Sequence, residues 1–267
     1  MPARPAPHAA ALTLLAAALL VCCGSGGGTS RGTTAGTTRP APAPTGTVTV
    51  LAAASLTESF SEIGRRFEAA HPGVRVRFGF GPSSGLARQI DQGAPADVFA
   101  AASGQTMDTV VRAGEASGPV TFARNTLEIA VPPDDPGHVT GLRDLARPGL
   151  AVAVCQPQVP CGAVAREAFA KAGVTVRPRT LGSDVRAVLT TVELGEVDAG
   201  VVYRTDVRAA GGKVRGVAIP ADWNASTSYP IAVLTRSAGS AAARAFVAFV
   251  RSDTGRAVLA GAGFDPP

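Results

Sequence analysis

Residues 47–70 read TVTVLAAASLTESFSEIGRRFEAA, and this stretch decides the fold class. Its first part, Thr47 to Leu51, is short and β-branched, which is typical of a buried strand. Phe60 and Phe67 then recur at helical spacing, so the sequence predicts a helix over 57–70 that ends at a Pro-Gly turn. A strand that leads straight into an amphipathic helix is the building unit of an α/β fold.

The rest of the chain repeats this unit. The patterns predict further strands over 74–80, 97–101, 127–131, 151–155, 199–203, 214–219 and 229–235, and further helices over 86–92, 106–113, 163–171, 185–194, 241–250 and 254–261. Strands that alternate with helices predict parallel sheets, and the number of elements is enough for two sheets in two lobes.

The chain is expected to cross between the lobes near Asn125 and to return between Ala221 and Tyr229. The predicted domains are therefore a first lobe of 46–124 with 229–267 and a second lobe of 125–228. Ligands of open α/β sheets bind at the carboxyl ends of the strands. In a two-lobed α/β protein this places the ligand in the cleft between the lobes.

The N-terminus has the pattern of a targeting segment. An apolar run from Ala9 to Val21 follows Arg4, and it is too short to span a bilayer as a mature helix. It ends in Cys22-Cys23, which resembles a bacterial lipobox with Cys23 as the lipidated residue and Cys22 as the alternative. An ordinary secretory signal is the other interpretation. The sequence thus predicts a lipoprotein signal peptide over 1–23 and a protein anchored to the outer face of the cell membrane.

Residues 24–45 consist almost entirely of Gly, Ser, Thr, Ala and Pro. Such a segment cannot bury enough apolar surface to order itself, so the sequence predicts a disordered tether. The cysteines beyond the signal, Cys155 and Cys161, lie close together in a turn-rich loop, which predicts a disulfide in an oxidising exterior. A zinc site would need further ligands, and His71 and His138 are the only histidines outside the signal.

Composition and motifs argue against several function classes. The net charge is +5, and no run of Lys and Arg is interleaved with aromatic residues, so nucleic-acid binding has no support. The chain has no Gly-x-Ser-x-Gly or Walker-type motif. His71 and His138 both lie beside Pro-Gly turns, where a Ser-His-Asp triad is not expected. We therefore expect a binding protein, not an enzyme.

Four short polar segments, each between a strand and a helix, are the best candidates for a site. They centre on Ser55, Ser83 with Ser84, Cys161 and Val185. One interpretation is helix capping, since Ser55 and the glutamate three residues later have capping-box spacing and a serine at 83 or 84 suits an N-cap. The other is anion binding: each helix N-terminus carries about half a positive charge, so four around one cleft suit a tetrahedral dianion. The sequence leaves both open.

These segments also carry a family resemblance that runs from about residue 47 to residue 264. The chain resembles the periplasmic molybdate-binding components of ABC transporters, which are extracellular solute-binding proteins with a two-lobed, type II periplasmic-binding-protein-like fold. The motifs that carry the likeness are Ala52-Ala-Ala-Ser-Leu-Thr57, Leu86-Ala-Arg-Gln-Ile90, Gly93-Ala-Pro-Ala-Asp-Val98, Val159-Pro-Cys-Gly162, Asp184-Val-Arg186 and Gly200-Val-Val-Tyr203.

The resemblance implies that hydrogen bonds from neutral groups hold molybdate or tungstate, with no direct protein–metal ligand and no cofactor. Matched by motif, these are the hydroxyls of Ser55, Ser83 and Tyr203 and the backbone N–H groups of Cys161 and Val185. This sequence departs from the usual pattern in two places. Gly-Pro precedes the second loop, which leaves the neighbouring Ser84 as an alternative to Ser83, and Cys161 replaces a familiar alanine.

The resemblance also implies a monomer that delivers its ligand to an ABC permease and ATPase complex. A binding protein for another oxyanion, such as sulfate or phosphate, is the alternative. An iron–anion complex would call for a second tyrosine in a suitable loop, and the chain has only Tyr203 and Tyr229.

Overall fold

The computed structural model describes residues 43–237 and 240–267. The predicted signal peptide, the lipidation site and the tether up to residue 42 lie outside the described residues. The strands are β1 (Gly46–Ala53), β2 (Val74–Gly81), β3 (Val98–Ala100), β4 (Val120–Val131), β5 (Val152–Cys155), β6 (Thr180–Gly182), β7 (Ala199–Tyr203), β8 (Arg215–Ala218) and β9 (Ser226–Val233). The helices are α1 (Thr57–Ala70), α2 (Ser83–Asp91), α3 (Gly104–Arg112), α4 (Pro160–Ala172), α5 (Val185–Glu193), α6 (Arg204–Ala210), α7 (Ala241–Val250) and α8 (Asp253–Ala262).

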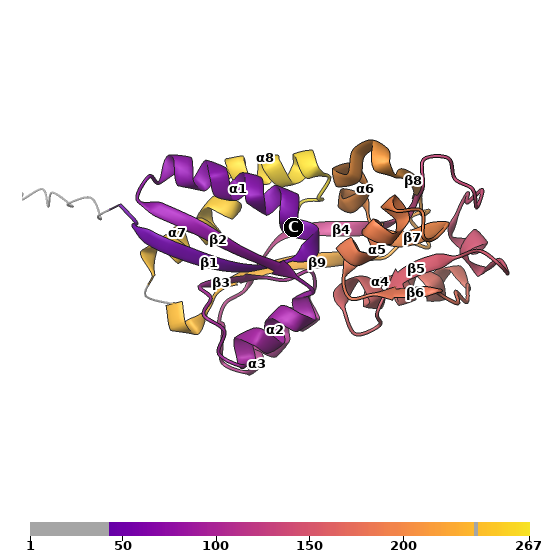
Figure 1. Cartoon of the computed structure of the whole chain (residues 1–267). Helices are drawn as coiled ribbons and strands as arrows, with labels where there is room; N and C mark the ends of the chain where they lie inside the picture. Colours follow the sequence, from indigo (N-terminus) through magenta and orange to yellow (C-terminus); the bar gives the residue numbers. More distant parts are fainter. Residues whose placement is uncertain (1–42, 238–239) are drawn as a thin grey trace, which may run out of the picture. The chain divides into compact units, whose positions relative to one another are not determined.

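The strands pair in the order β2-β1-β3-β9-β4-β7-β5-β6, with β8 added to β4. The outer pairs β1–β2, β1–β3, β5–β6 and β5–β7 are parallel, as the alternation of strands and helices predicts. The parallel prediction is wrong for β4 and β9, which run antiparallel to each other and to their other neighbours. They differ because the chain passes from one lobe to the other along β4 and returns along β9, with no crossover helix between strands of one sheet (Figure 1).

Strand β4 belongs to both lobes. Its residues 120–126 pair with β9, whereas residues 127–131 pair with β7 and β8. The two expected sheets are therefore joined through one long strand. The sequence placed the start of this strand at Leu127, seven positions too late, because Arg124 and Asn125 interrupt the apolar pattern that marks a strand.

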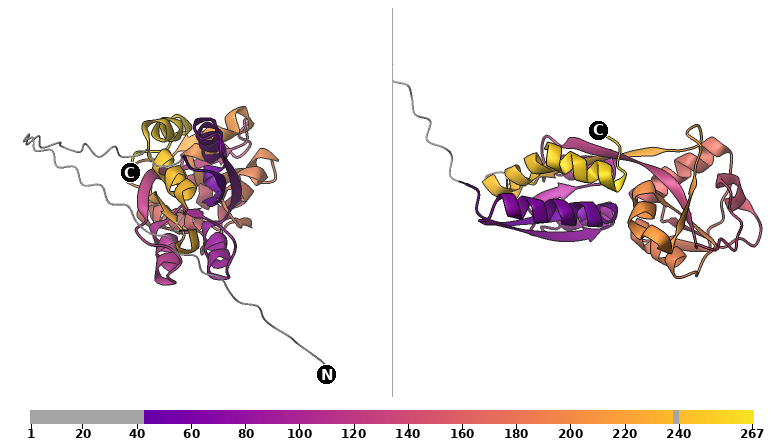
Figure 2. Two further views of the ribbon diagram at one scale, coloured as in Figure 1. Left: turned by 90° about the vertical axis from the view of Figure 1, so that its left-hand side faces the viewer. Right: turned by 90° about the horizontal axis from the view of Figure 1, so that it is seen from above.

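Each lobe has its own hydrophobic core. In the first lobe α1, α7 and α8 cover one face of the sheet and α2 and α3 the other (Figures 1 and 2). The first of these layers is aromatic, with the rings of Phe60 and Phe67 edge-on against Phe246. In the second lobe α4, α5 and α6 surround strands made mostly of Val and Ala. Helices lie directly after most strands, so their first turns gather where the two lobes face each other.

Candidate functional site

A small cavity lies where the carboxyl ends of β1, β2, β3, β5, β6 and β7 come together. Its volume of about 20 Å³ is room for one small ion or one or two water molecules. The residues that line it are Ala53, Ala54, Ser55, Gly81, Pro82, Ser83, Ala102, Val159, Pro160, Cys161, Asp184, Val185 and Tyr203. The structure thus brings together all five residues to which the resemblance assigned an anion, and it places Ser84 on a neighbouring, larger cavity.

The hydroxyl of Ser55 is directed to a tyrosine and not to its own helix. Its Oγ lies 2.8 Å from the hydroxyl of Tyr229, and both side chains are buried. Helix α1 begins after Leu56, and no side chain caps it. The capping-box interpretation of Ser55 is therefore wrong, because its oxygen is engaged 174 positions away in the sequence.

Ser83 is held from the neighbouring strand. Its Oγ accepts a hydrogen bond of 3.0 Å from the backbone N–H of Ala102, which follows β3. The N-cap of α2 is Pro82, and no side chain caps this helix either, so the capping interpretation fails here as well. Because an N–H group can only donate, the Ser83 oxygen is the acceptor and its own proton remains available to a further acceptor.

The second lobe offers backbone N–H groups. Asp184 caps α5, since its Oδ1 accepts from the N–H of Ala187 at 3.0 Å, which confirms the capping interpretation for this segment. The N–H of Val185 lies in the first turn of α5, and the N–H of Cys161 lies in the first turn of α4, where N–H groups have no acceptor within the helix. Both residues line the cavity, so their helix ends can receive an anion there.

The loop before α4 is tightly fixed. Cys155 and Cys161 form the predicted disulfide, with their Cα atoms 5.7 Å apart. Gly162 lies so close to the chain that a Cβ atom there would stand 2.0 Å from the carbonyl oxygen of Gln156, so no larger residue fits. The cross-link and the close packing together hold the first turn of α4 in place against the end of β5.

Tyr203 carries a buried polar atom that lacks a partner. Its side chain is 1% exposed, and its hydroxyl has no hydrogen-bond partner within residues 43–237 and 240–267. The ring packs edge-on against Tyr229 at a centroid distance of 6.3 Å. Burial raises the pKa of the Tyr203 phenol well above its ordinary value, with smaller contributions from the Tyr229 and Asp206 side chains. The group is therefore a neutral phenol that can donate, and a buried hydroxyl at a cavity with no partner in the described chain indicates a site for a bound hydrogen-bonding group.

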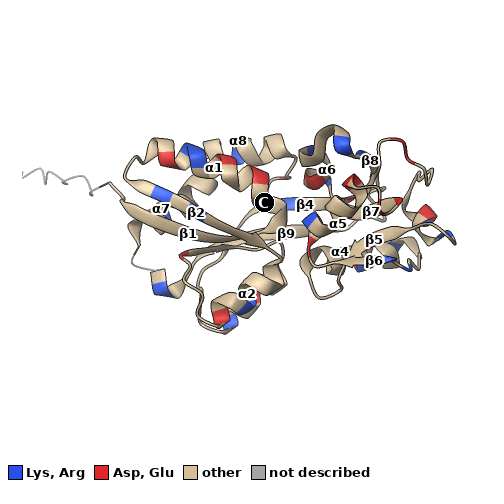
Figure 3. Ribbon diagram, viewed as in Figure 1, with Lys and Arg blue, Asp and Glu red and all other residues tan. Residues whose placement is uncertain are grey.

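Side chains bring little charge to the cavity. No Lys or Arg is among the residues that line it, and Asp184 is the only charged one. Arg186 follows Val185 in the sequence, and its Nη2 lies 3.1 Å from the carboxylate of Glu58 on the first lobe. Its Nη1 is buried and has no partner in the described chain. Elsewhere basic and acidic positions are both distributed over the helices and strands of the two lobes (Figure 3).

A wholly buried carboxyl lies just behind Tyr203. The Oδ2 of Asp206 accepts from the N–H of Tyr203 at 3.0 Å. Burial raises the pKa of Asp206 to about 7, against the lowering by this hydrogen bond and by the charge of Arg186. The site therefore has a neighbouring group that gains a negative charge near neutral pH.

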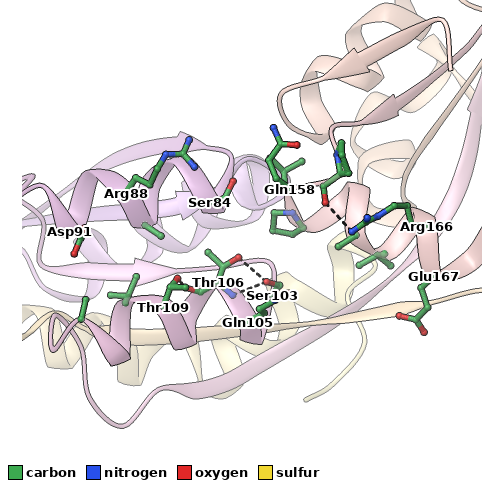
Figure 4. Close-up of a pocket in the computed structure, with 18 of the residues that line it drawn as sticks. Ser84, Arg88, Asp91, Ser103, Gln105, Thr106, Thr109, Gln158, Arg166 and Glu167 are labelled. Carbon is green, nitrogen blue, oxygen red and sulfur yellow. Dashed lines mark hydrogen bonds between the residues drawn. The ribbon is translucent and has the colours of Figure 1, made fainter.

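A larger cavity of about 740 Å³ adjoins the small one, with which it shares Val159 and Pro160. It lies between α2 and α3 of the first lobe and the β5–α4 loop with α4 of the second (Figure 4). Its charged residues have both signs, namely Arg88, Asp91, Glu115, Arg166 and Glu167. A mixed lining of this kind does not select anions, so selection falls to the small cavity. Within the described ranges, no group of three or more His, Cys, Asp and Glu side chains could hold a metal ion.

The family model and the relatives that match this chain agree on one family. The family model described as bacterial extracellular solute-binding protein matches residues 48–265. The molybdate-binding protein ModA of Mycobacterium tuberculosis is 42% identical over 239 residues, which cover 87% of this chain and 92% of that protein. The substrate-binding lipoprotein YvgL of Bacillus subtilis, which is named as a putative ABC transporter component, is 31% identical and covers 82% of this chain and 86% of its own length.

A solved structure agrees with the fold. The periplasmic molybdate-binding protein of Azotobacter vinelandii superposes with a TM-score of 0.73 and covers 82% of this chain and 99% of that one, at 20% identity. This match confirms the predicted two-lobed α/β architecture of periplasmic binding proteins.

Proposed function

The chain belongs to the bacterial extracellular solute-binding protein family, and from this premise we propose that it captures molybdate or tungstate and delivers it to an ABC importer. The names of its relatives support the ligand and the transport role, and such a family is one of binding proteins and not of enzymes. The single observation that carries the proposal is the hydroxyl of Tyr203, which has no partner among the described residues and is buried at a cavity of the size of a small ion.

We propose that the ion is held by three hydroxyls and two backbone N–H groups, with no direct protein–metal bond. The hydroxyls are those of Ser55, Ser83 and Tyr203, and the N–H groups are those of Cys161 and Val185. Support comes from their common position around the cavity and from its lack of Lys and Arg. Oxygens that carry no protons match donors of this kind, and the helix ends supply the positive potential. Ligand groups from both lobes imply that binding closes the cleft.

Titration calorimetry with molybdate, tungstate, sulfate and phosphate tests the proposal. Molybdate and tungstate should bind about equally, since they have nearly the same size and charge. Sulfate is a smaller dianion, and each hydrogen bond that it makes poorly costs about 1–3 kcal/mol, so its affinity should be lower by several powers of ten. Phosphate, the other alternative ligand, is also smaller than molybdate and should bind weakly for the same reason. Equal or tighter binding of sulfate or phosphate would contradict this assignment.

The location and partners follow from the same role. We propose that Cys23 is lipidated, that residues 24–45 tether the protein to the outer face of the membrane, and that a monomer meets the permease and ATPase complex. The apolar run before Cys23 and the lipoprotein among the relatives support the anchor. Labelled palmitate should enter the wild type and not Cys23→Ala. Labelling that persists in Cys23→Ala and disappears in Cys22→Ala would move the anchor to Cys22.

A further inference from the structure

A chain of buried hydrogen bonds leads from the small cavity into the strands that cross between the lobes. It runs from Ser55 to Tyr229 at 2.8 Å and from Tyr229 to the side-chain nitrogen of Asn125 at 3.4 Å. The same nitrogen lies 2.8 Å from the hydroxyl of Thr205, at the start of α6. All four side chains are buried, and Asn125 and Tyr229 are 0% exposed. Neither of these two residues lines the cavity.

One backbone group sets the direction of the two bonds from Asn125, and these in turn favour Tyr229 as the donor to Ser55. The N–H of Thr126 meets the Asn125 side chain at 3.0 Å, and because an N–H can only donate, the atom that it meets is the amide oxygen. The amide NH₂ then faces the two hydroxyls and donates to both. Tyr229 therefore accepts from Asn125, and its phenol proton is free for the oxygen of Ser55.

We propose that Asn125 and Tyr229 are positioning residues which turn the proton of Ser55 into the cavity and so make it a donor to the bound anion. When Ser55 accepts from Tyr229, its own proton is left for an acceptor in the cavity, because its hydroxyl makes no other hydrogen bond within the described residues. Ser83 is fixed in the same sense by the N–H of Ala102. The inference rests on the proposed function, and it explains how hydroxyls, which can donate or accept, are oriented so that their protons face the anion.

The consequence is discrimination by protonation as well as by size. Apart from the carboxylate of Asp184, whose Oδ1 already accepts from the N–H of Ala187, the polar side chains at the cavity are hydroxyls. Hydroxyls whose protons face the ligand suit an anion with no proton, whereas hydrogen phosphate needs an acceptor. If the phenol of Tyr229 is absent, Ser55 is free to rotate and to accept. The burial that raises the pKa of the Tyr229 phenol keeps its proton in place at all physiological pH values. Tyr229→Phe should therefore weaken molybdate binding and relax the discrimination against phosphate.

A double-mutant cycle tests this by calorimetry on the whole protein. Tyr229→Phe should weaken molybdate binding about tenfold in the wild type and by less than twofold in Ser55→Ala, because its effect passes through that hydroxyl. The ratio of molybdate to phosphate affinity should fall in Tyr229→Phe as well. An equal loss in both backgrounds would mean that Tyr229 acts through packing or lobe closure, and no loss in the wild type would also overturn the proposal.

Asn125→Ala provides a second route should Tyr229→Phe fold poorly. This change removes no group that we place on the anion, and it leaves the phenol without the donor that sets its direction. Molybdate binding should weaken about threefold to tenfold with the same relaxation toward phosphate, and an unchanged ratio would overturn the proposal. A wild type that does not bind molybdate at all would instead refute the proposed function, so the two failures are distinguishable.

Discussion

Removal of one oxygen atom, by Tyr203→Phe, separates binding from folding at the proposed site. The hydroxyl has no partner in the described part of the chain, so the unliganded fold loses no hydrogen bond with it. The ring and its contact with Tyr229 remain. A buried hydroxyl without a partner carries a desolvation cost of about 1–3 kcal/mol, so the unliganded variant should be as stable as the wild type or slightly more stable.

Molybdate binding should weaken, because the complex loses a hydrogen bond that the unliganded protein does not make. A hydrogen bond to a charged group contributes about 1.5–3 kcal/mol, so the dissociation constant for molybdate should rise about tenfold to a hundredfold. Titration calorimetry measures this directly. Thermal denaturation with and without molybdate gives an independent measure, because the ligand-induced rise in melting temperature follows affinity by mass action and should shrink.

Ser55→Ala is the matched comparison. It also removes one hydroxyl from the cavity, but it leaves the phenol of Tyr229 without its 2.8 Å partner. Its unliganded stability should therefore fall by about 1 kcal/mol while its affinity falls as in Tyr203→Phe. If Tyr203→Phe binds molybdate as tightly as the wild type, the placement of Tyr203 on the anion is wrong. If it destabilises the unliganded protein as Ser55→Ala does, its hydroxyl has a structural partner.

Three further predictions concern charge and the disulfide. Burial raises the pKa of Asp206 to about 7, far above its unfolded value. Between about pH 4 and 7 the folded state therefore holds a proton that the unfolded state has lost, and the free energy of unfolding falls as pH rises through that window. The ionised carboxylate also repels a dianion, so affinity should fall on the order of tenfold from pH 6 to 8, and Asp206→Asn should abolish both effects in calorimetry and melting curves. Reduction of Cys155–Cys161 should lower the free energy of unfolding by about 2 kcal/mol and weaken binding severalfold, and two free thiols by mass in the native protein would contradict the disulfide. Arg186→Gln should weaken binding by at most about fivefold, since its half-exposed pair with Glu58 contributes about 0–1 kcal/mol. A hundredfold loss would mean that the buried guanidinium nitrogen, which has no partner in the described chain, binds the anion.

The sequence predicted best those elements whose pattern is local and strong. Helix α1 has the predicted bounds because its aromatic residues recur over several turns and a Pro-Gly turn ends it. Strand β6 and helix α6 were missed, since three and seven residues are too few to show a period. Strand β4 was cut short because its crossing half is polar and pairs with a strand a hundred positions later.

The candidate site shows the same limit. The segments with Ser55 and Ser83 were recognised, but spacing alone could not separate capping from binding, and the structure decides against capping in both. The sequence shows Tyr229 only as a second tyrosine, because its bond to Ser55 spans 174 positions, which no local pattern encodes. The one sequence feature that points to a role for Tyr229 is a tyrosine at the position where the chain is expected to return between the lobes.

Selection between ions of equal charge requires hydrogen-bond donors that do not move. In this protein, selectivity therefore depends on the groups that hold the donors in place as much as on the donors themselves. A serine hydroxyl rotates freely in solution, and the N–H groups at a helix end shift with the loop before them. In this protein a backbone N–H fixes Ser83, a cross-link holds the turn with Cys161, and the cap by Asp184 orders the first turn of α5. A ligand with shorter bonds cannot draw such donors inward without breaking these anchors, so loosening any one anchor should reduce the preference for molybdate over sulfate more than it reduces the affinity for molybdate.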